Sequence, residues 1–505
     1  MTSVKTRKKT EFGDFQTPSR LAEEVCRVVA ARRVRPSAIV EPTCGKGAFL
    51  VAALKQFPSA RTALGLETNA DHLGISRERL HDPRPVTLLQ GNFFTFDWPV
   101  ALRKMEEPIL VIGNPPWVTS AGLGWFDSSN LPPKSNFQQH RGLDALTGKS
   151  NFDIAEWMVV RMLECLSGRV ATVAMLLKTS VARRVLLHAW KSRIALADAA
   201  MLTFDAQEYF GAAVRACLLI LDLSPAGSSA QCRVSDLRHP EGKARVVAYE
   251  KGVLVADKAA FDRWHHLMLD APQRGFYRWR SGVKHDCAPV MELRRTASGL
   301  TNGLSDTVDL EENCLYPLLK GTDVARGVAA HPRILLLVTQ TEPGQDTTYL
   351  ASTAPRTWAY LAKHAKALDG RRSSIYRKRP RFSIFGVGRY TFAPWKVAIS
   401  GLHKKFHFVA VGSQGGKPIL VDDTCYHISC KYADEARLLA SVLNGPVAAE
   451  FYGAFVFWDA KRPVTADLLN RLDLAALVDE MGQKRRLLEL RPDFARGAAA
   501  VKALF

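Results

Sequence analysis

A short polar and aromatic stretch, Asn114-Pro115-Pro116-Trp117, carries the residue types best suited to chemistry in this chain. It follows an apolar run, residues 108–113, which predicts a buried strand. The two prolines fix φ and remove two amide donors, so we expect the chain to leave the strand as a stiff loop. That loop would hold a carboxamide, a free carbonyl and an indole at the C-terminal edge of a sheet, where open α/β folds bind their ligands.

These groups suit methyl transfer to an exocyclic amino group. The nitrogen of an aromatic amine is a poor nucleophile, because its lone pair is delocalised into the ring. Two acceptors, the side-chain oxygen of Asn114 and the carbonyl of Pro115, would draw the nitrogen towards a tetrahedral geometry while Trp117 stacks on the base. In-line attack on a sulfonium methyl then needs only positioning and preorganised polar groups. For the tetrapeptide alone, an ordinary Pro-Pro turn at a strand end remains the alternative.

Three other strand ends carry groups that suit a nucleoside ligand. Residues 37–50 predict a strand, a glycine turn at Gly45 and Gly47, and a helix, so the backbone can approach a ligand closely. The strand over 62–67 ends in Glu67, at a distance from the turn that suits an acid binding ribose hydroxyls. A further strand, 86–90, precedes Asn92 and Phe93, an amide and an aromatic ring that can hold adenine. The turn matches neither the dinucleotide fingerprint nor the P-loop.

In this order, the pieces resemble the catalytic domain of class I S-adenosylmethionine-dependent methyltransferases. More narrowly, they resemble the DNA adenine-N6 enzymes of the TaqI type, whose gamma-type order is Thr-Pro segment, glycine turn, ribose acid, adenine-binding tip and NPP-aromatic loop. The resemblance implies base flipping, with Trp117 and Phe210 stacking on the target adenine; ordinary core packing is the alternative for Phe210. Many relatives carry Asp at the position of Asn92 and Tyr at that of Trp117. The implied catalytic residues are Asn114, Pro115, Pro116 and Trp117, and the implied cofactor contacts are Thr17, Glu41, Thr43, Gly45, Gly47, Glu67, Asn92, Phe93, Asn114 and Pro116.

Other chemistries are compatible with parts of this pattern. Cytosine-C5 methylation requires a cysteine nucleophile, and no Pro-Cys loop of the expected kind is present. Cytosine-N4 enzymes more often carry Ser in place of Asn114. Methylation of RNA or of a protein glutamine also uses NPP-aromatic loops, and a catalytically inactive DNA-binding subunit is a further alternative. The large basic C-terminal half favours duplex DNA over RNA and protein, and the intact loop favours an active enzyme.

The composition is that of a basic globular protein. Of 505 residues, 47% are hydrophobic and 23% charged, and the formal net charge is +20, which favours a polyanionic partner such as DNA. The nine cysteines include no CxxC pair, which fits reduced thiols in a cytoplasm and predicts no metal site. We expect no membrane span.

The sequence predicts an α/β Rossmann-like methyltransferase domain and a mixed α+β target-recognition domain. The expected segments are a basic arm (1–11), the catalytic domain (12–224), a linker (225–245), the target-recognition domain (246–478) and a helical tail (479–505). Within the second domain, a basic run with interleaved aromatics predicts DNA contacts at Arg371, Arg372, Arg377, Lys378, Arg379 and Arg381. We expect a monomer, with any restriction endonuclease encoded separately.

Overall fold

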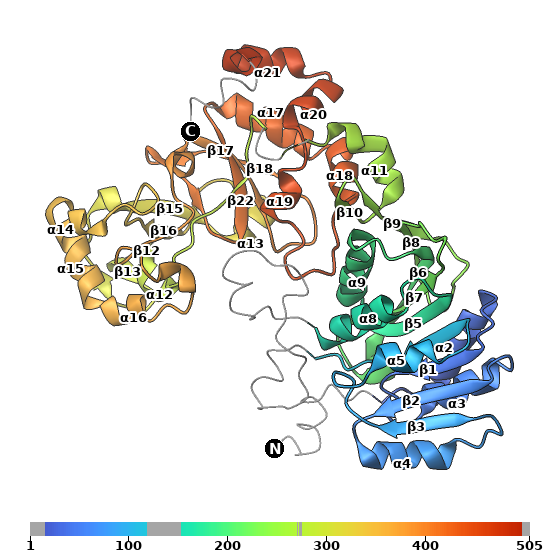
Figure 1. Ribbon diagram of the computed structural model, residues 1–505. Coiled ribbons are helices and arrows are strands. Elements are labelled where there is room, and N and C mark those ends of the chain that lie inside the picture. Colours follow the sequence, from blue (N-terminus) through green and yellow to red (C-terminus); the bar gives the residue numbers. More distant parts are fainter. Residues whose placement is uncertain (1–15, 119–152, 270, 272–274, 497–505) are drawn as a thin grey trace. The chain divides into compact units, whose positions relative to one another are not determined.

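The chain forms two compact units, residues 1–258 and 259–505. The computed structural model describes residues 16–118, 153–269, 271 and 275–496 (Figure 1). The basic arm predicted for residues 1–11 lies outside the described residues, as does the end of the tail, 497–505.

The first unit is organised around a ten-stranded sheet. Five neighbouring strands, in the order β3-β2-β1-β4-β5, are parallel, and β7 lies antiparallel between β5 and β6. This is the Rossmann-like arrangement that the sequence predicts. The strands, in sheet order, are β10 (Val253–Val255), β9 (Arg245–Glu250), β8 (Gln231–Asp236), β6 (Leu196–Asp205), β7 (Arg215–Leu223), β5 (Ala171–Lys178), β4 (Ile109–Gly113), β1 (Ala38–Glu41), β2 (Thr62–Glu67) and β3 (Val86–Gln90).

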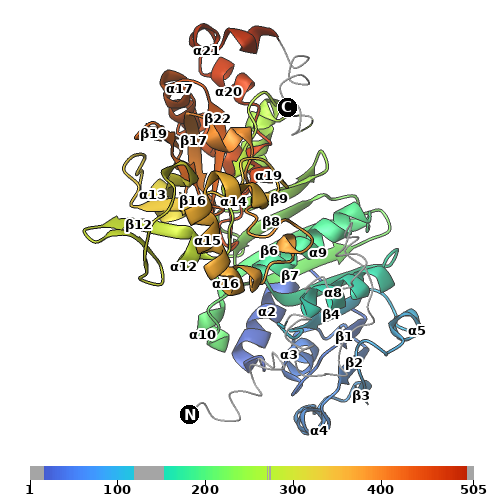
Figure 2. The same ribbon diagram turned by 90° about the vertical axis from the view of Figure 1, so that its left-hand side faces the viewer.

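Helices cover both faces of this sheet. Alternate strand residues such as Leu110 and Leu176 form one core with α2 and α3, as period-two alternation requires. Figures 1 and 2 show α8 and α9 over the opposite face. The helices are α2 (Ser19–Ala31), α3 (Ala48–Gln56), α4 (Ala70–Arg79), α5 (Trp98–Arg103), α8 (Ile154–Cys165), α9 (Thr179–Lys191) and α10 (Ala206–Phe210).

The segment predicted to be a linker, 225–245, instead continues the sheet. Within it, β8 pairs in parallel with β6, and β9 and β10 then add antiparallel strands. The physical reason is that buried and exposed residues alternate along β8: Cys232 and Val234 are buried, whereas Gln231 and Arg233 are exposed. The Pro, Gly and Ser residues before β8 hide this strand pattern in the sequence. The first compact unit therefore ends at Lys258 and not at residue 224.

The second unit is mixed α+β, as expected, and contains two larger sheets and a small ribbon. The six-stranded sheet has the order β14-β13-β12-β16-β15-β21, and the four-stranded sheet has the order β11-β22-β17-β18. The strands are β11 (Arg280–Ser281), β12 (Glu292–Thr296), β13 (Gly299–Asn302), β14 (Thr307–Val308), β15 (Leu315–Leu319), β16 (Ile334–Leu337), β17 (Trp395–Ser400), β18 (Val409–Val411), β19 (Ser413–Gln414), β20 (Lys417–Pro418), β21 (Leu420–Val421) and β22 (Cys425–Cys430).

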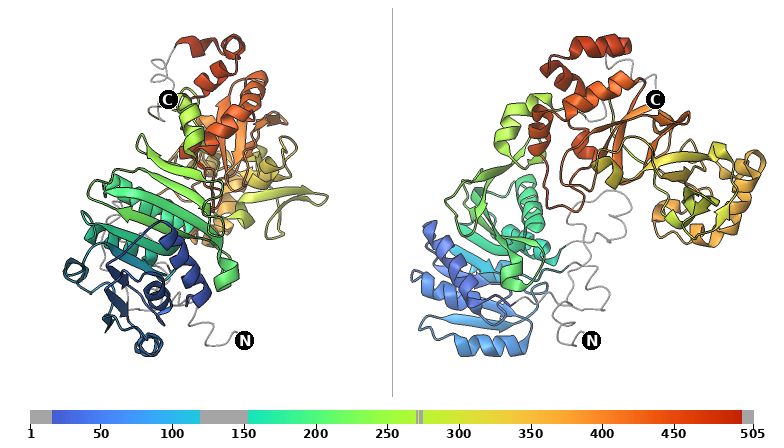
Figure 3. Two further views of the ribbon diagram at one scale, coloured as in Figure 1. Left: turned by 90° about the vertical axis from the view of Figure 1, so that its right-hand side faces the viewer. Right: turned by 180° about the vertical axis from the view of Figure 1, so that it is seen from behind.

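Each larger sheet of the second unit has its own helices (Figure 3). Leu350, Leu361 and Leu368, from α14, α15 and α16, join the core of the six-stranded sheet, and α17 packs against the four-stranded sheet. The helices are α11 (Lys258–Trp264), α12 (Ala288–Met291), α13 (Gly321–Ala325), α14 (Leu350–Thr353), α15 (Pro355–Lys363), α16 (Ala365–Asp369), α17 (Ala433–Leu443), α18 (Pro446–Gly453), α19 (Ala466–Leu469), α20 (Leu474–Glu480) and α21 (Lys484–Leu490).

The segment predicted as a helical tail packs onto the second unit. Arg491, just after α21, donates to the fully buried carboxylate of Glu435 on α17 over 2.5 Å, and the hydroxyl of Tyr277 donates to the same carboxylate over 3.0 Å. A buried carboxylate needs such partners, because desolvation of an unpaired charge is costly. This part of the tail therefore belongs to the folded unit.

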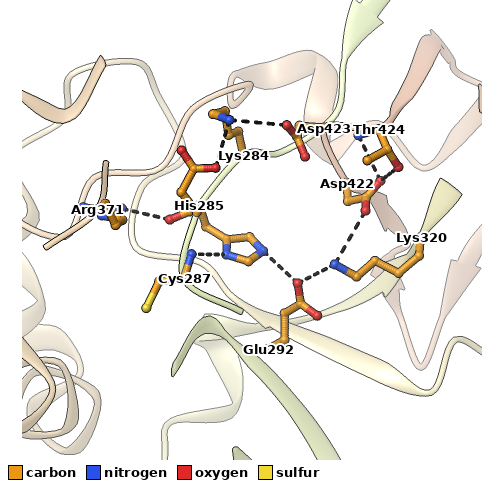
Figure 4. Close-up of polar contacts among 10 residues, drawn as sticks. Lys284, His285, Cys287, Glu292, Lys320, Arg371, Asp422, Asp423 and Thr424 are labelled. Atoms are coloured by element: carbon orange, nitrogen blue, oxygen red, sulfur yellow. Dashed lines mark hydrogen bonds and ion pairs between the residues drawn. The ribbon is translucent and has the colours of Figure 1, made fainter. Parts of the chain in front are cut away.

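A polar network lies in the second unit beside the start of β12 and the ends of β15 and β21 (Figure 4). Lys320 contacts the carboxylate of Glu292 and lies 3.5 Å from that of Asp422, and His285 Nε2 lies 3.0 Å from Glu292. Although burial would raise the pKa of Glu292, hydrogen bonds from His285 and Lys320 hold it below its ordinary value. The network is a structural ion cluster of the second unit.

No helix in the described ranges is both long and apolar enough to cross a bilayer.

Candidate active site

The parallel strands of the first unit bring the predicted site residues to one edge of the sheet. Glu41 is the last residue of β1, Glu67 ends β2, and Asn114 follows β4. Because β1, β2 and β4 are neighbouring parallel strands, their C-terminal ends lie side by side. This is the edge at which open α/β sheets bind ligands.

The glycine turn after β1 is held by Glu67. Its Oε2 accepts a hydrogen bond from the amide of Gly45 over 2.8 Å, and its Oε1 accepts one from the amide of Asn69, also over 2.8 Å. Gly45 and Gly47 have φ values of +50° and +77°, and a Cβ at Gly47 would lie 2.4 Å from Ser76 Oγ. Both the backbone conformation and the close approach of α4 therefore require glycine at position 47.

The Thr17 segment lies against this turn. The side-chain oxygen of Gln16 accepts a hydrogen bond from the amide of Lys46 over 3.3 Å, and a Cβ at Gly45 would contact the same oxygen. The structure thus brings Thr17, predicted to contact the cofactor, next to the glycine turn, from which it is far in sequence.

Glu41 is almost fully buried beneath the turn. Its Oε2 accepts a hydrogen bond from the amide of Leu50 over 3.0 Å, at the start of α3. Burial raises the pKa of Glu41 well above its ordinary value, and the nearby charge of Glu67 adds to the increase. Thr43, between Glu41 and the glycines, is half-buried.

The two residues predicted to bind adenine, Asn92 and Phe93, have different surroundings in the turn after β3. Asn92 Oδ1 accepts a hydrogen bond from the amide of Phe94 over 2.9 Å and shapes the turn. Phe93 is only 3% exposed, and its ring packs 5.1 Å from Trp98 and 6.2 Å from Trp157. In this structure the ring of Phe93 is therefore a core side chain.

The Asn-Pro-Pro-Trp loop is anchored by its tryptophan. Trp117 is 6% exposed, its indole nitrogen donates to the carbonyl of Leu176 on β5 over 3.2 Å, and its ring lies 5.3 Å from that of Phe210 at an interplanar angle of 69°. The two rings predicted to stack on a target base are thus adjacent and in edge-to-face contact. Asn114 and Pro116 are half-buried and Pro115 is buried.

Sequence reasoning missed a lysine that contacts this loop. Lys178, the last residue of β5, donates from Nζ to the carbonyl of Trp117 over 3.0 Å and to Asp153 Oδ2 over 2.8 Å. Its signal is weak: one lysine at the end of an otherwise mostly apolar strand, far in sequence from both partners.

The six basic residues predicted to contact DNA fall into three groups in the structure. The guanidinium of Arg371 is half-buried, donates to the carbonyls of Leu368, His285 and Ser383, and lies 3.6 Å from the centroid of the Tyr376 ring. The guanidinium of Arg371, predicted from the sequence to contact DNA, is thus engaged in structural hydrogen bonds. Arg381 is exposed and paired with Asp369. The others are exposed and have no ion pair within the described ranges: Arg372, Arg377, Lys378 and Arg379.

Comparisons with known proteins identify the family of this chain. No family profile matches the chain. It is 43% identical over 472 residues to the Type II methyltransferase M.NspV of a Nostoc species, and the match covers 93% of this chain and 97% of that protein. Its fold is similar to that of the Type IIL restriction-modification enzyme MmeI, solved in complex with DNA, with a TM-score of 0.51 and 12% identity. That match covers 93% of this chain and 66% of MmeI, so the chain spans just under two thirds of that enzyme.

The strand order and the glycine turn after the first strand are those of class I S-adenosylmethionine-dependent methyltransferases, as predicted. The methyl donor is accordingly S-adenosylmethionine. At this level of identity over almost the whole length of both proteins, the chain belongs to the Type II methyltransferases of restriction-modification systems.

The residues at the sheet edge fit this donor. The carboxylate of Glu67 ends β2 at this edge and suits ribose hydroxyls, and the absence of side chains at Gly45 and Gly47 lets a ligand approach the turn before α3. When bound, S-adenosylmethionine supplies an electrophilic methyl group on a positively charged sulfur.

Proposed function

We propose that this enzyme methylates the N6 amino group of adenine in duplex DNA, at a specific site and by base flipping. The observation that carries the proposal is the contact between Trp117 and Phe210 beside the Asn114 loop, at the same sheet edge as the glycine turn. This arrangement supports the proposal, because two aromatic rings that can stack on a base lie beside an amide that can accept hydrogen bonds from an amino group. The net charge of +20 supports a nucleic-acid substrate.

In the proposed reaction, the target adenine leaves the duplex and stacks against Trp117 and Phe210. Unstacking costs a few kcal/mol, and stacking on an aromatic side chain contributes about 1–3 kcal/mol per base, so the two contacts offset the cost. Asn114 and the carbonyl of Pro115 accept hydrogen bonds from the amino group and orient its lone pair. A bond then forms from N6 to the methyl carbon while the bond from that carbon to sulfur breaks, and N6 releases one proton to solvent.

Substitution of Asn114 provides the direct test. Asn114→Ala should reduce methylation to background while calorimetry shows nearly unchanged binding of S-adenosylmethionine, because the amide acts on the reacting amino group. The measurement is tritium transfer from labelled cofactor to duplex DNA, RNA and protein, followed by identification of the methylated nucleoside. Wild-type turnover by the variant, or a product other than N6-methyladenine, would overturn the proposal.

We further propose that the enzyme acts as a monomer and that any partner endonuclease is a separate polypeptide. Light scattering of the purified chain with and without the DNA duplex tests the first of these; a stable dimer in both conditions would contradict it.

A further inference from the structure

Lys178 links the catalytic loop to a distant part of the chain. Its Nζ donates to the carbonyl of Trp117 over 3.0 Å and to the carboxylate of Asp153 over 2.8 Å. Lys178 ends β5, and Asp153 precedes α8, whose first turn it caps by accepting a hydrogen bond from Ala155. A single ammonium therefore joins the loop after β4, the end of β5 and the start of α8.

A backbone hydrogen bond closes the same junction. The amide of Ile154 donates to the carbonyl of Val118 over 2.9 Å, so the chain is paired with itself one residue beyond each partner of Lys178. The indole of Trp117 is bound to the carbonyl of Leu176, two residues before Lys178 on the same strand. Both the carbonyl and the ring of Trp117 are thus fixed to β5.

Burial shields the ion pair between Lys178 and Asp153 from solvent. The side chain of Asp153 is 5% exposed and that of Lys178 is 23% exposed, so solvent replaces the pair poorly. The carboxylate neutralises the ammonium, whose remaining donor capacity goes to a neutral carbonyl of the catalytic loop. This is the chemistry of a structural clamp and differs from that of a lysine that carries net charge to a ligand.

We propose that Lys178 is a positioning residue for methyl transfer: with Asp153 it holds the carbonyl of Trp117, and thereby the Asn114 loop, in the reactive geometry. The inference rests on the proposed role of that loop. A displacement of about 1 Å in a reacting group can reduce turnover roughly 100-fold. Loss of the clamp should therefore lower kcat much more than it raises the KM for S-adenosylmethionine, because the glycine turn and Glu67 are held by other contacts and only part of the expected cofactor site lies on the loop.

The test compares Lys178→Met with variants that separate positioning from stability. Lys178→Met should lower kcat about 10- to 100-fold, and Lys178→Arg, which can still reach both oxygens, should recover most of it. In Lys178→Met alone, the buried carboxylate of Asp153 loses its partner. Adding Asp153→Asn removes this charge, and the asparagine oxygen can still cap α8. This double variant should regain thermal stability while kcat stays low, because the carbonyl of Trp117 is still not held.

Lys320→Met is the matched control. Lys320 is a comparably half-buried lysine, paired with Glu292 and Asp422 in the second unit (Figure 4). Its loss should lower stability and leave kcat within twofold of wild type.

A kcat for Lys178→Met within twofold of wild type, full recovery of kcat in the double variant, or an equal loss in Lys320→Met would overturn the proposal. Rates are compared as ratios on the substrate that wild type methylates, so a product other than N6-methyladenine would refute the proposed function without deciding this test.

Discussion

Phe210→Ala tests whether the aromatic pair holds the target base. In the structure, the rings of Trp117 and Phe210 lie 5.3 Å apart at 69°. Two rings that sandwich a base must be parallel and about 7 Å apart, twice the carbon–carbon contact distance. Binding of the base therefore requires the rings to separate by roughly 2 Å and to rotate towards parallel.

The expected effect is a difference between two contributions. Removal of Phe210 deletes one stacking face, worth about 1–3 kcal/mol. It also removes the edge-to-face pair that the incoming base must disrupt, worth about 0.5–1.5 kcal/mol. The net loss should be about 1 kcal/mol, or roughly a fivefold reduction in the flipped population and in kcat/KM.

The assay uses 2-aminopurine at the target position of the recognised duplex, which methylation-sensitive sequencing identifies. Fluorescence increases when this base analogue leaves the stack. Phe204→Ala serves as the control, because the ring of Phe204 is also half-buried and packs 6.5 Å from that of Phe210. Unchanged fluorescence and kcat/KM in Phe210→Ala, or an equal loss in Phe204→Ala, would refute the stacking role.

Three further predictions concern the cofactor site, the exposed basic residues of the second unit and a carboxylate at the start of α15. Glu67→Gln replaces one carboxylate oxygen with a donor that cannot accept from a backbone amide, so calorimetry should show at least tenfold weaker binding of S-adenosylmethionine; unchanged affinity would remove Glu67 from the site. Arg377→Glu with Arg379→Glu should make the salt dependence of DNA binding shallower by about one unit per lost phosphate contact, whereas Arg485→Glu, at a 94% exposed side chain on α21, should not. Although burial would raise the pKa of Glu311, hydrogen bonds from the start of α15 lower it to about 2. Its contribution to stability is present above pH 4.5 and is lost as the pH falls towards 2, so the melting temperature of Glu311→Gln should fall less steeply over that window.

The meeting of polar residues at one edge of the sheet was predictable because its signals are local. Each strand ends at a polar residue, as at Glu67, or directly before one, as at Asn114, and parallel strands bring these ends together. The family pattern predicted that Trp117 and Phe210 lie at one site on either side of a base, but it did not predict that the two rings contact each other directly. The location of Thr17 beside the glycine turn likewise agrees with the expected order of segments.

The remaining features depend on long-range packing that sequence patterns do not encode. The neighbouring sequence does not distinguish Arg371, whose guanidinium donates to three carbonyls, from the exposed Arg377 in the same run. The core location of the Phe93 ring depends on Trp98 of α5 and Trp157 of α8, neither of which is next to it in sequence. The Lys178 clamp joins residues that are 25 and 61 positions apart.

The continuation of the central sheet beyond residue 224 determines where the chain can be cut. A fragment ending there would lose β8, which pairs with β6 over Ala200–Thr203, and would leave the backbone donors and acceptors of that strand open to solvent. Exposed strand edges of this kind recruit other chains into intermolecular sheets. A soluble catalytic fragment should therefore be cloned to Lys258, where the short strand β10 provides a natural terminus for the sheet.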